Sequence, residues 1–289
     1  MILPKIFNQN SSTTFILCTI MLANFNNLSA NNINNFSEVR KLDLKNTTIN
    51  ATSSIKEIHQ IQEVSQYLTR KNCLVIFDID NTLLFPKTDL GSDQWFSHMV
   101  EAQTKLGVDT NTAIQAVLPI YFHVHAKIDL VPTELDLATK LTHIHTCCHH
   151  AICLTARSLP LVPATMAQLT KNNLDFPANP YAHLFIAIEH SFDLPHPHMY
   201  KNNVLFCGLN DKGTVLLAYL DHINYKPDLI VFVDDKAKNI TAVELAAKQR
   251  NIEFVGLRYA GCDQRVQDFN HADTQQELQE FLTKHPYNN

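Results

Sequence analysis

Short apolar runs alternate with amphipathic segments along most of the chain. Runs typical of buried strands occur at 74–77, 151–154, 204–207, 228–233 and 253–257. Between and after them, helical spacing of apolar residues or helix-start signals predict helices at 132–145, 160–171, 210–220, 241–249 and 274–284. Strands alternating with helices predict an α/β fold, a doubly wound parallel sheet with helices on both faces.

Two further segments complete the predicted organisation. Apolar residues at positions 55, 58, 61, 64 and 68 predict a helix, and Ser54 with Glu57 offers a capping box at its start. The segment 85–131 lacks strand alternation, and helices are expected at 93–106 and 110–124. We therefore divide the chain into a core (53–84 and 132–289) and a mostly helical insert (85–131). A segment with four prolines near 177–197 is expected to be largely loop.

The N-terminus has the pattern of an export signal. Residues 1–30 carry a single charge at Lys5, an apolar run at 15–23 and a small residue at Ala30. The run is too short to span a bilayer, so we expect no stable membrane anchor and a periplasmic or secreted protein. An uncleaved N-terminal anchor is the alternative. Residues 31–52 are rich in Asn, Ser and Thr and predict a poorly ordered leader.

Composition narrows the range of partners. The chain has 289 residues, of which 45% are hydrophobic and 18% charged, with a formal net charge of −5. It contains no long basic run, so nucleic acid and anionic membranes are not favoured partners. Export permits disulfides, but Cys73 and Cys153 lie in or beside apolar runs, so at most one disulfide is expected.

Candidate chemistry begins where the first apolar run ends, at Asp78 and Asp80. Residues two apart on an extended chain share a face, so both carboxylates should project from the C-terminal edge of the sheet. Open α/β folds place their binding sites at that edge. Adjacent carboxylates repel each other unless a cation or shared proton relieves them, and a divalent cation with a phosphate substrate would do so. A simple Asx-rich turn is the alternative.

Three more polar groups stand at comparable places. Thr155 follows the second predicted strand, Lys212 lies at a helix start, and Asp234 with Asp235 follows the apolar run 228–233. Each has a structural alternative: a strand end, a solvated first-turn lysine and an acidic turn. Taken together in this order, they favour a common site.

These residues resemble the four motifs of the haloacid dehalogenase (HAD) superfamily over about residues 55–260. The resemblance implies that Asp78 is the nucleophile, forming an aspartyl-phosphate, and that Asp80 is the general acid and base. It also implies that Thr155 and Lys212 contact the phosphoryl group. The insert would correspond to the cap of this superfamily.

The resemblance further implies a Mg²⁺ cofactor. Its ligands would be Asp78, the backbone carbonyl of Asp80, and Asp234, with Asp235 acting directly or through water. An acid at the position of Asp80 points to hydrolysis of phosphate esters, as in the secreted class B and class C bacterial acid phosphatases. The expected substrate is a small phosphorylated metabolite or a phosphoprotein. The alternatives are a phosphotransferase to an acceptor alcohol and a non-catalytic secreted binding protein on the same scaffold.

Weaker candidates complete the sequence-based site. Arg157 could bind a second anionic group on a substrate or form a surface salt bridge. Trp95 could stack on a substrate or pack in the core of the insert. Asn81 is taken as a substrate-binding candidate within the first motif. The His/Cys-rich segment 143–150 has soft-metal ligands, but it precedes a strand and should lie at the sheet edge opposite the chemistry.

Overall fold

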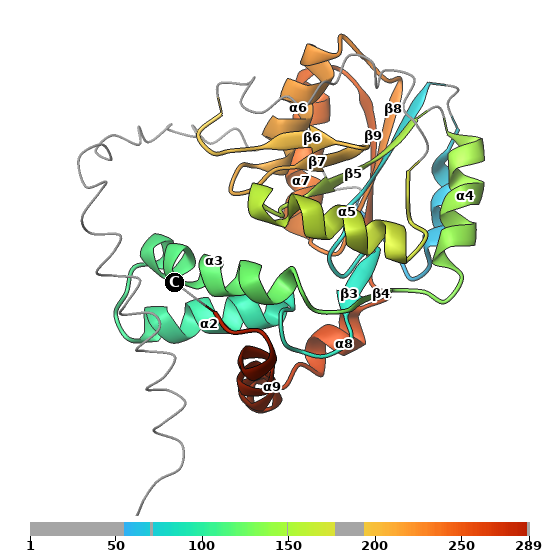
Figure 1. Cartoon of the computed structure of the whole chain (residues 1–289). Coiled ribbons are helices and arrows are strands. Elements are labelled where there is room, and N and C mark those ends of the chain that lie inside the picture. The colour runs from blue at the N-terminus through green and yellow to red at the C-terminus, as the bar shows by residue number, and fades with distance from the viewer. Residues whose placement is uncertain (1–54, 70–71, 149, 177–193, 288–289) are drawn as a thin grey trace, which may run out of the picture. The chain divides into compact units, whose positions relative to one another are not determined.

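A seven-stranded sheet forms the core of the protein (Figure 1). The structure is a computed structural model that describes residues 55–69, 72–148, 150–176 and 194–287. In spatial order the strands are β1 (Lys56–Ile58), β9 (Glu253–Tyr259), β8 (Leu229–Asp234), β2 (Cys73–Phe77), β5 (His150–Thr155), β7 (Val204–Phe206) and β6 (Met199–Lys201). All neighbours are parallel except β6 and β7. The predicted doubly wound α/β fold is confirmed.

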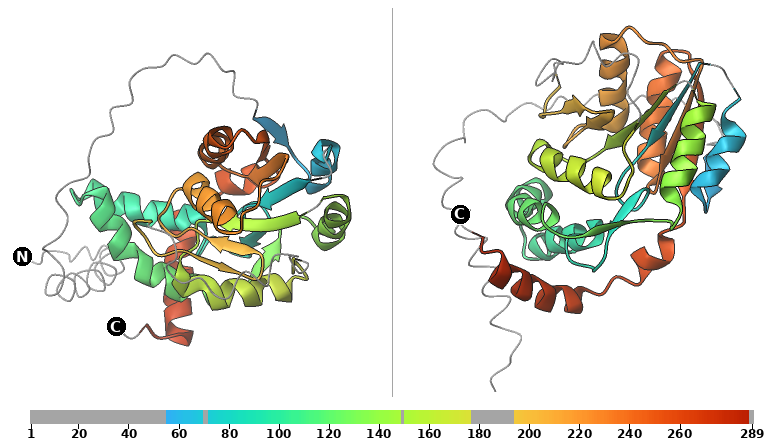
Figure 2. Two further views of the ribbon diagram at one scale, coloured as in Figure 1. Left: turned by 90° about the horizontal axis from the view of Figure 1, so that it is seen from above. Right: turned by 45° about the vertical axis from the view of Figure 1, so that its right-hand side comes forward.

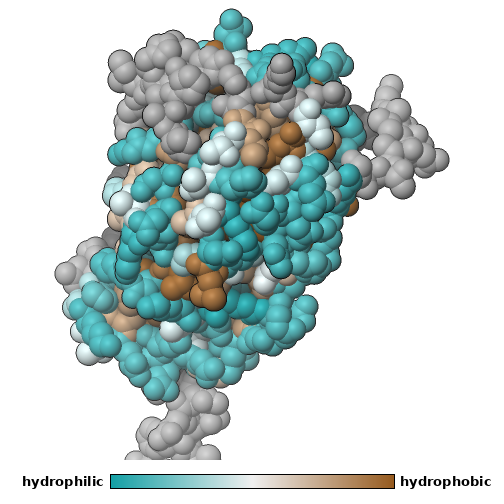
Figure 3. Space-filling view, turned by 90° about the vertical axis from the view of Figure 1, so that its right-hand side faces the viewer, coloured by the Kyte–Doolittle hydropathy of each residue, from teal (hydrophilic) through white to brown (hydrophobic). Residues whose placement is uncertain are grey.

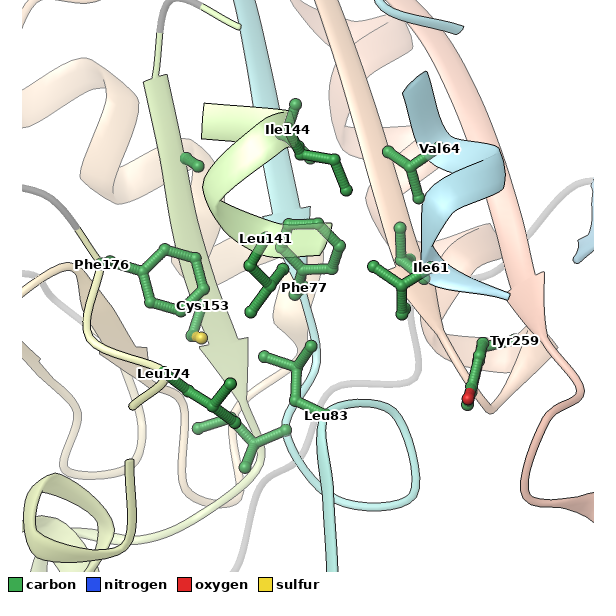
Figure 4. Packing of buried hydrophobic residues seen from close by; sticks show 14 of the residues in the cluster. Ile61, Val64, Phe77, Leu83, Leu141, Ile144, Cys153, Leu174, Phe176 and Tyr259 are labelled. Carbon is green, nitrogen blue, oxygen red and sulfur yellow. The ribbon is translucent and has the colours of Figure 1, made fainter. Parts of the chain in front are cut away.

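Helices cover both faces of this sheet. Alternate residues of β2 point to opposite sides, as the period of two requires. Val75 and Phe77 pack with the 3-10 helix η1 (Ile61–Tyr67), α4 (Leu137–Cys147) and α5 (Val162–Lys171). Leu74 and Ile76 pack with α6 (Lys212–His222) and α7 (Ala237–Gln249). Figure 4 shows the first cluster, and Figure 2 gives two further views of the layers.

Two predicted helices begin differently from the expectation. Where a helix from residue 55 was expected, Lys56–Ile58 forms edge strand β1 beside β9, and the helical part is limited to η1. The Glu63 carboxylate of η1 accepts hydrogen bonds from the backbone N–H groups of His59 and Gln60. The predicted apolar positions Ile58, Ile61 and Val64 are nevertheless buried. The helix expected at 132–145 begins at Leu137, because residues 130–132 form strand β4 (Leu130–Pro132), which pairs antiparallel with β3 (Leu84–Pro86). The other core helices are the 3-10 turn η2 (Leu159–Leu161) before α5, and α8 (Asp263–Gln267).

A second compact unit contains the predicted insert helices. It comprises α2 (Asp93–Lys105), α3 (Thr110–His125) up to residue 124, and the C-terminal α9 (His271–Lys284). Both insert helices match their expected ranges to within one residue. The sequence-based division had left 270–289 in the core, whereas the backbone N–H of Leu90 donates to Glu277 of α9 within this unit. The predicted export signal 1–30, the leader 31–52 and positions 177–193 of the predicted proline-rich loop lie outside the described residues.

The surface and the cysteines add two observations. The face in Figure 3 is mainly hydrophilic, with apolar side chains in small separate groups. Within the described residues, no helix combines the length and apolar character that a membrane span requires. The six described cysteines all have free thiols.

Candidate active site

Asp78 and Asp80 stand immediately after β2, in the middle of the sheet. The backbone N–H of Asp78 donates to the carbonyl of Val233 on β8, which continues the strand pairing by one residue. The chain then turns through Asn81, whose φ of 60° is a left-handed conformation that asparagine tolerates better than most residues. The backbone N–H of Leu84 closes the turn on the carbonyl of Ile79. This turn leaves both carboxylates at the C-terminal edge.

Lys212 bridges two of the acidic groups. It is the first residue of α6, and its Nζ lies 2.6 Å from Oδ1 of Asp78 and 2.7 Å from Oδ2 of Asp234. Burial alone would lower the pKa of Lys212, but the charges of Asp234 and Asp78 raise it above its ordinary value. Both carboxylates therefore favour the protonated ammonium.

A close approach of two helices fixes the position of Lys212. A Cβ on the adjacent Gly213 would lie 2.4 Å from the carbonyl oxygen of Ala242 in α7. Only glycine permits this spacing between α6 and α7. The start of α6, and with it Lys212, is thereby held against the acidic cluster.

Asp78, Asp234 and Asp235 form a cluster suited to a divalent cation. One oxygen of each lies within 4.8 Å of the others, and this is the only such group of three possible ligands among the described residues. Burial, together with the charges of Asp234, Asp235 and Asp80, raises the pKa of Asp78, while Lys212 opposes this effect. Three carboxyl groups share one ammonium, so a cation would relieve their mutual repulsion. The donor set, all hard oxygens, fits Mg²⁺.

Two asparagines support the cluster. Asn239 on α7 donates its amide N–H groups to Oδ1 and Oδ2 of Asp234, at 3.0 and 3.1 Å, and the backbone N–H of Lys236 donates to Oδ1. The side-chain nitrogen of Asn81 lies 3.5 Å from Oδ2 of Asp235. Asn81 is thus next to the cluster, oriented toward a carboxylate. Sequence reasoning missed Asn239, although its position five residues after Asp234, in the first turn of the next helix, is a usable signal.

Thr155 and Arg157 lie at the end of β5, beside β2. Cys153 of β5 pairs with Phe77 of β2, and Thr155 follows two residues later. Thr155 is buried, and its Oγ1 accepts a hydrogen bond from the backbone N–H of Arg157. The guanidinium of Arg157 is buried as well and makes a two-pronged ion pair with Asp80. Burial would raise the pKa of Asp80, but Arg157 outweighs it and holds that pKa well below the usual range. Arg157 was expected to bind a substrate anion or to form a surface salt bridge, whereas this ion pair with Asp80 is buried.

Two sequence-based candidates lie elsewhere. Trp95 is 1% exposed in the helical unit, with its ring 6.3 Å from that of Tyr121, so the structure favours the core role over stacking on a substrate. The His/Cys segment runs from the end of α4 to the start of β5, at the strand end opposite Asp78. Its described part holds a His143–Cys147 contact of 3.9 Å.

Comparison with known proteins identifies the family but no activity. A family model described as "Protein of unknown function (DUF2608)" matches residues 54–285, which is most of the chain. The chain belongs to this family. The match includes every residue of the cluster, from Asp78 to Asp235.

Similar proteins of this length occur in Chlamydia. A protein of Chlamydia trachomatis serovar D is 25% identical over 208 residues, covering 71% of this chain and 76% of the relative. A protein of Chlamydia pneumoniae is 25% identical over 214 residues, covering 70% and 76%. Both relatives carry the name "Putative outer membrane protein".

Proposed function

We propose that this DUF2608 protein is a Mg²⁺-dependent phosphatase of the HAD type, hydrolysing phosphate monoesters through an aspartyl-phosphate. The observation that carries the proposal is the cluster of Asp78, Asp234 and Asp235, two of which form ion pairs with the buried ammonium of Lys212. A nucleophilic carboxylate, a cation-binding acidic pair and a fixed positive charge are what phosphoryl transfer requires in one place.

The first half-reaction begins at Asp78. One of its oxygens attacks the phosphorus atom of the substrate in line, the bond from phosphorus to the ester oxygen breaks, and an aspartyl-phosphate forms. Because Arg157 holds the pKa of Asp80 low, Asp80 begins as a carboxylate, takes up the proton of the monoanionic phosphate ester and passes it to the departing oxygen. Lys212 and the hydroxyl of Thr155 stabilise the negative charge on the transferring oxygens.

The second half-reaction restores the enzyme. Asp80, now a carboxylate, accepts a proton from water as the water oxygen attacks the phosphorus atom. The bond from phosphorus to the oxygen of Asp78 breaks, its electron pair returns to the Asp78 carboxylate, and phosphate leaves. Mg²⁺ held by Asp78, Asp234 and Asp235 would neutralise charge on the phosphoryl oxygens in both steps.

Substrate and location extend the same proposal. The substrate is the phosphate monoester of a small metabolite, or an exposed phosphorylated residue of a protein. The signal-like pattern at 1–30 and the names of the chlamydial relatives support export to the periplasm or beyond the cell. N-terminal sequencing of the protein from cell fractions would test this, because an intact residue 1 would contradict cleavage.

Turnover of p-nitrophenyl phosphate by residues 31–289 tests the activity. We expect hydrolysis with Mg²⁺, loss of hydrolysis with EDTA, and no turnover by folded Asp78→Asn. The matched control is Asp221→Asn, which alters a surface carboxylate paired with Arg250 and should leave turnover unchanged. Absence of wild-type turnover with a broad panel of phosphate esters and saturating Mg²⁺ would overturn the proposal.

A further inference from the structure

A buried polar network surrounds the carboxylate of Asp80. Arg157 is 4% exposed and donates from Nε and Nη2 to Oδ2 and Oδ1 of Asp80, at 2.9 and 2.7 Å. Its remaining nitrogen, Nη1, donates to Oγ1 of Thr165 at 2.9 Å and to Oε1 of Gln168 at 2.7 Å. Both acceptors lie on α5 and are buried. The guanidinium therefore spans the space between α5 and the turn after β2.

The network continues to the point where the chain re-enters the core. The side-chain nitrogen of Gln168 donates to the backbone carbonyl of His125 at 3.0 Å. His125 is the first core residue after the helical insert, and its ring is 1% exposed. Its Nε2 lies 3.9 Å from Oδ1 of Asp80. Asp80 thus lies between Arg157, from the loop after β5, and His125, the last residue of α3, while α5 holds Arg157 from behind.

We propose that Arg157 is a positioning residue for Asp80 and that Gln168 holds Arg157 in place for this task. The role rests on the proposed phosphatase activity. Proton transfer to a leaving oxygen needs the carboxylate of Asp80 within hydrogen-bond reach and in a fixed orientation. A guanidinium fork fixes the plane of a carboxylate, which a lysine ammonium cannot do.

The same geometry argues against a substrate-binding role for Arg157. Four hydrogen bonds to Asp80, Thr165 and Gln168 occupy four of its five N–H donors. Moving the guanidinium to a substrate anion would leave the buried acceptors on Asp80, Thr165 and Gln168 without these donors, and unpaired buried polar groups are destabilising. A positioning role requires no such movement.

Leaving-group dependence tests this role directly. Protonation of the leaving oxygen affects kcat strongly for an alkyl phosphate, because its leaving alkoxide is basic. It affects kcat weakly for p-nitrophenyl phosphate, because nitrophenolate is a weak base. In Arg157→Lys and Gln168→Leu we expect the ratio of kcat for glycerol phosphate to kcat for p-nitrophenyl phosphate to fall by about 10–100-fold. KM should stay near the wild-type value for both substrates. Gln168→Glu, which keeps an acceptor for Nη1, should retain most of the ratio.

The chain offers a matched control. Arg250 makes the same two-pronged contact with Asp221 on the exposed surface, and Arg250→Lys should leave the ratio unchanged. An equal fall of kcat for both substrates, or a rise of KM confined to substrates with a second anionic group, would overturn the positioning role. A wild-type protein without turnover would overturn the phosphatase proposal and this role together. If the wild type turns over but the ratio of the two kcat values is the same in the variants as in the wild type, only the positioning role of Arg157 is overturned.

Discussion

The ammonium of Lys212 lies 2.6 Å from the carboxylate of Asp78, in a site where both side chains are almost fully buried. The contact joins the start of α6 to the end of β2, and its two residues are 134 positions apart in the sequence. It places a permanent positive charge beside the proposed nucleophile. It also balances part of the charge of an acidic cluster that burial would otherwise make costly.

Replacing Lys212 should make the fold depend on Mg²⁺. In Lys212→Met, Asp78 and Asp234 lose their common partner, and we expect a destabilisation of about 3–5 kcal/mol in EDTA, partly reversed by Mg²⁺. Turnover should fall by roughly 10²–10³-fold. Thermal unfolding with and without Mg²⁺ measures the first effect. Lys248→Met, which removes an exposed ammonium from its pair with Glu244, is the control, and equal melting shifts in both variants would contradict this account.

Asn239 should control metal affinity more than folding. Asn239→Leu removes both amide donors from Asp234 while preserving approximate side-chain size. We expect the Mg²⁺ concentration for half-maximal turnover to rise by about 10–100-fold, as for other residues that orient a metal ligand. A Mg²⁺ titration of activity checks this, with the exposed neighbour Lys238→Met as the control. An unchanged half-maximal concentration would remove Asn239 from the site.

His145 should make stability fall in acid. Burial lowers the pKa of this half-buried imidazole, which packs beside Phe176, to about 4. Between the unfolded pKa near 6.5 and this value, the unfolded chain binds a proton that the folded chain does not, so stability decreases as the pH falls from 7 toward 4. His145→Phe should recover about 1–2 kcal/mol of that loss, after allowance for partial exposure.

Thermal melts across this pH range measure the effect of His145. The matched control is His143→Phe, which changes an exposed histidine on the same helix and should keep the wild-type pH dependence. Identical curves for the wild type and His145→Phe would show that this imidazole is protonated as easily in the folded state as in the unfolded chain.

The sequence predicted the sheet and the residues at its edge because both follow from local patterns. Asp78, Thr155 and Asp234 each end an apolar run, and parallel strands bring such ends to one edge. The short strand β1 was missed, since the three-residue spacing of Ile58, Ile61 and Val64 fits a helix equally well.

The environment of Asp80 could not be read from the sequence. Gln168 and Thr165 lie on a helix 85 or more positions from Asp80, on a face that looks like ordinary amphipathic packing. Only the tertiary fold turns that face toward Arg157. The burial of Trp95 has the same origin, because its partner Tyr121 comes from the next helix.

Trapping the phosphorylated enzyme tests the central claim most directly. Asp80→Asn removes the base that the second half-reaction needs, so this variant should accumulate phosphate on Asp78 when mixed with p-nitrophenyl phosphate and Mg²⁺ and then quenched in acid. Peptide mass spectrometry should find a hydroxylamine-sensitive phosphoryl group on the peptide that contains Asp78. The double variant that also carries Asp78→Asn should show no such group. Turnover by the wild type with no such adduct in the variant, or an adduct on any other residue, would contradict Asp78 as the nucleophile.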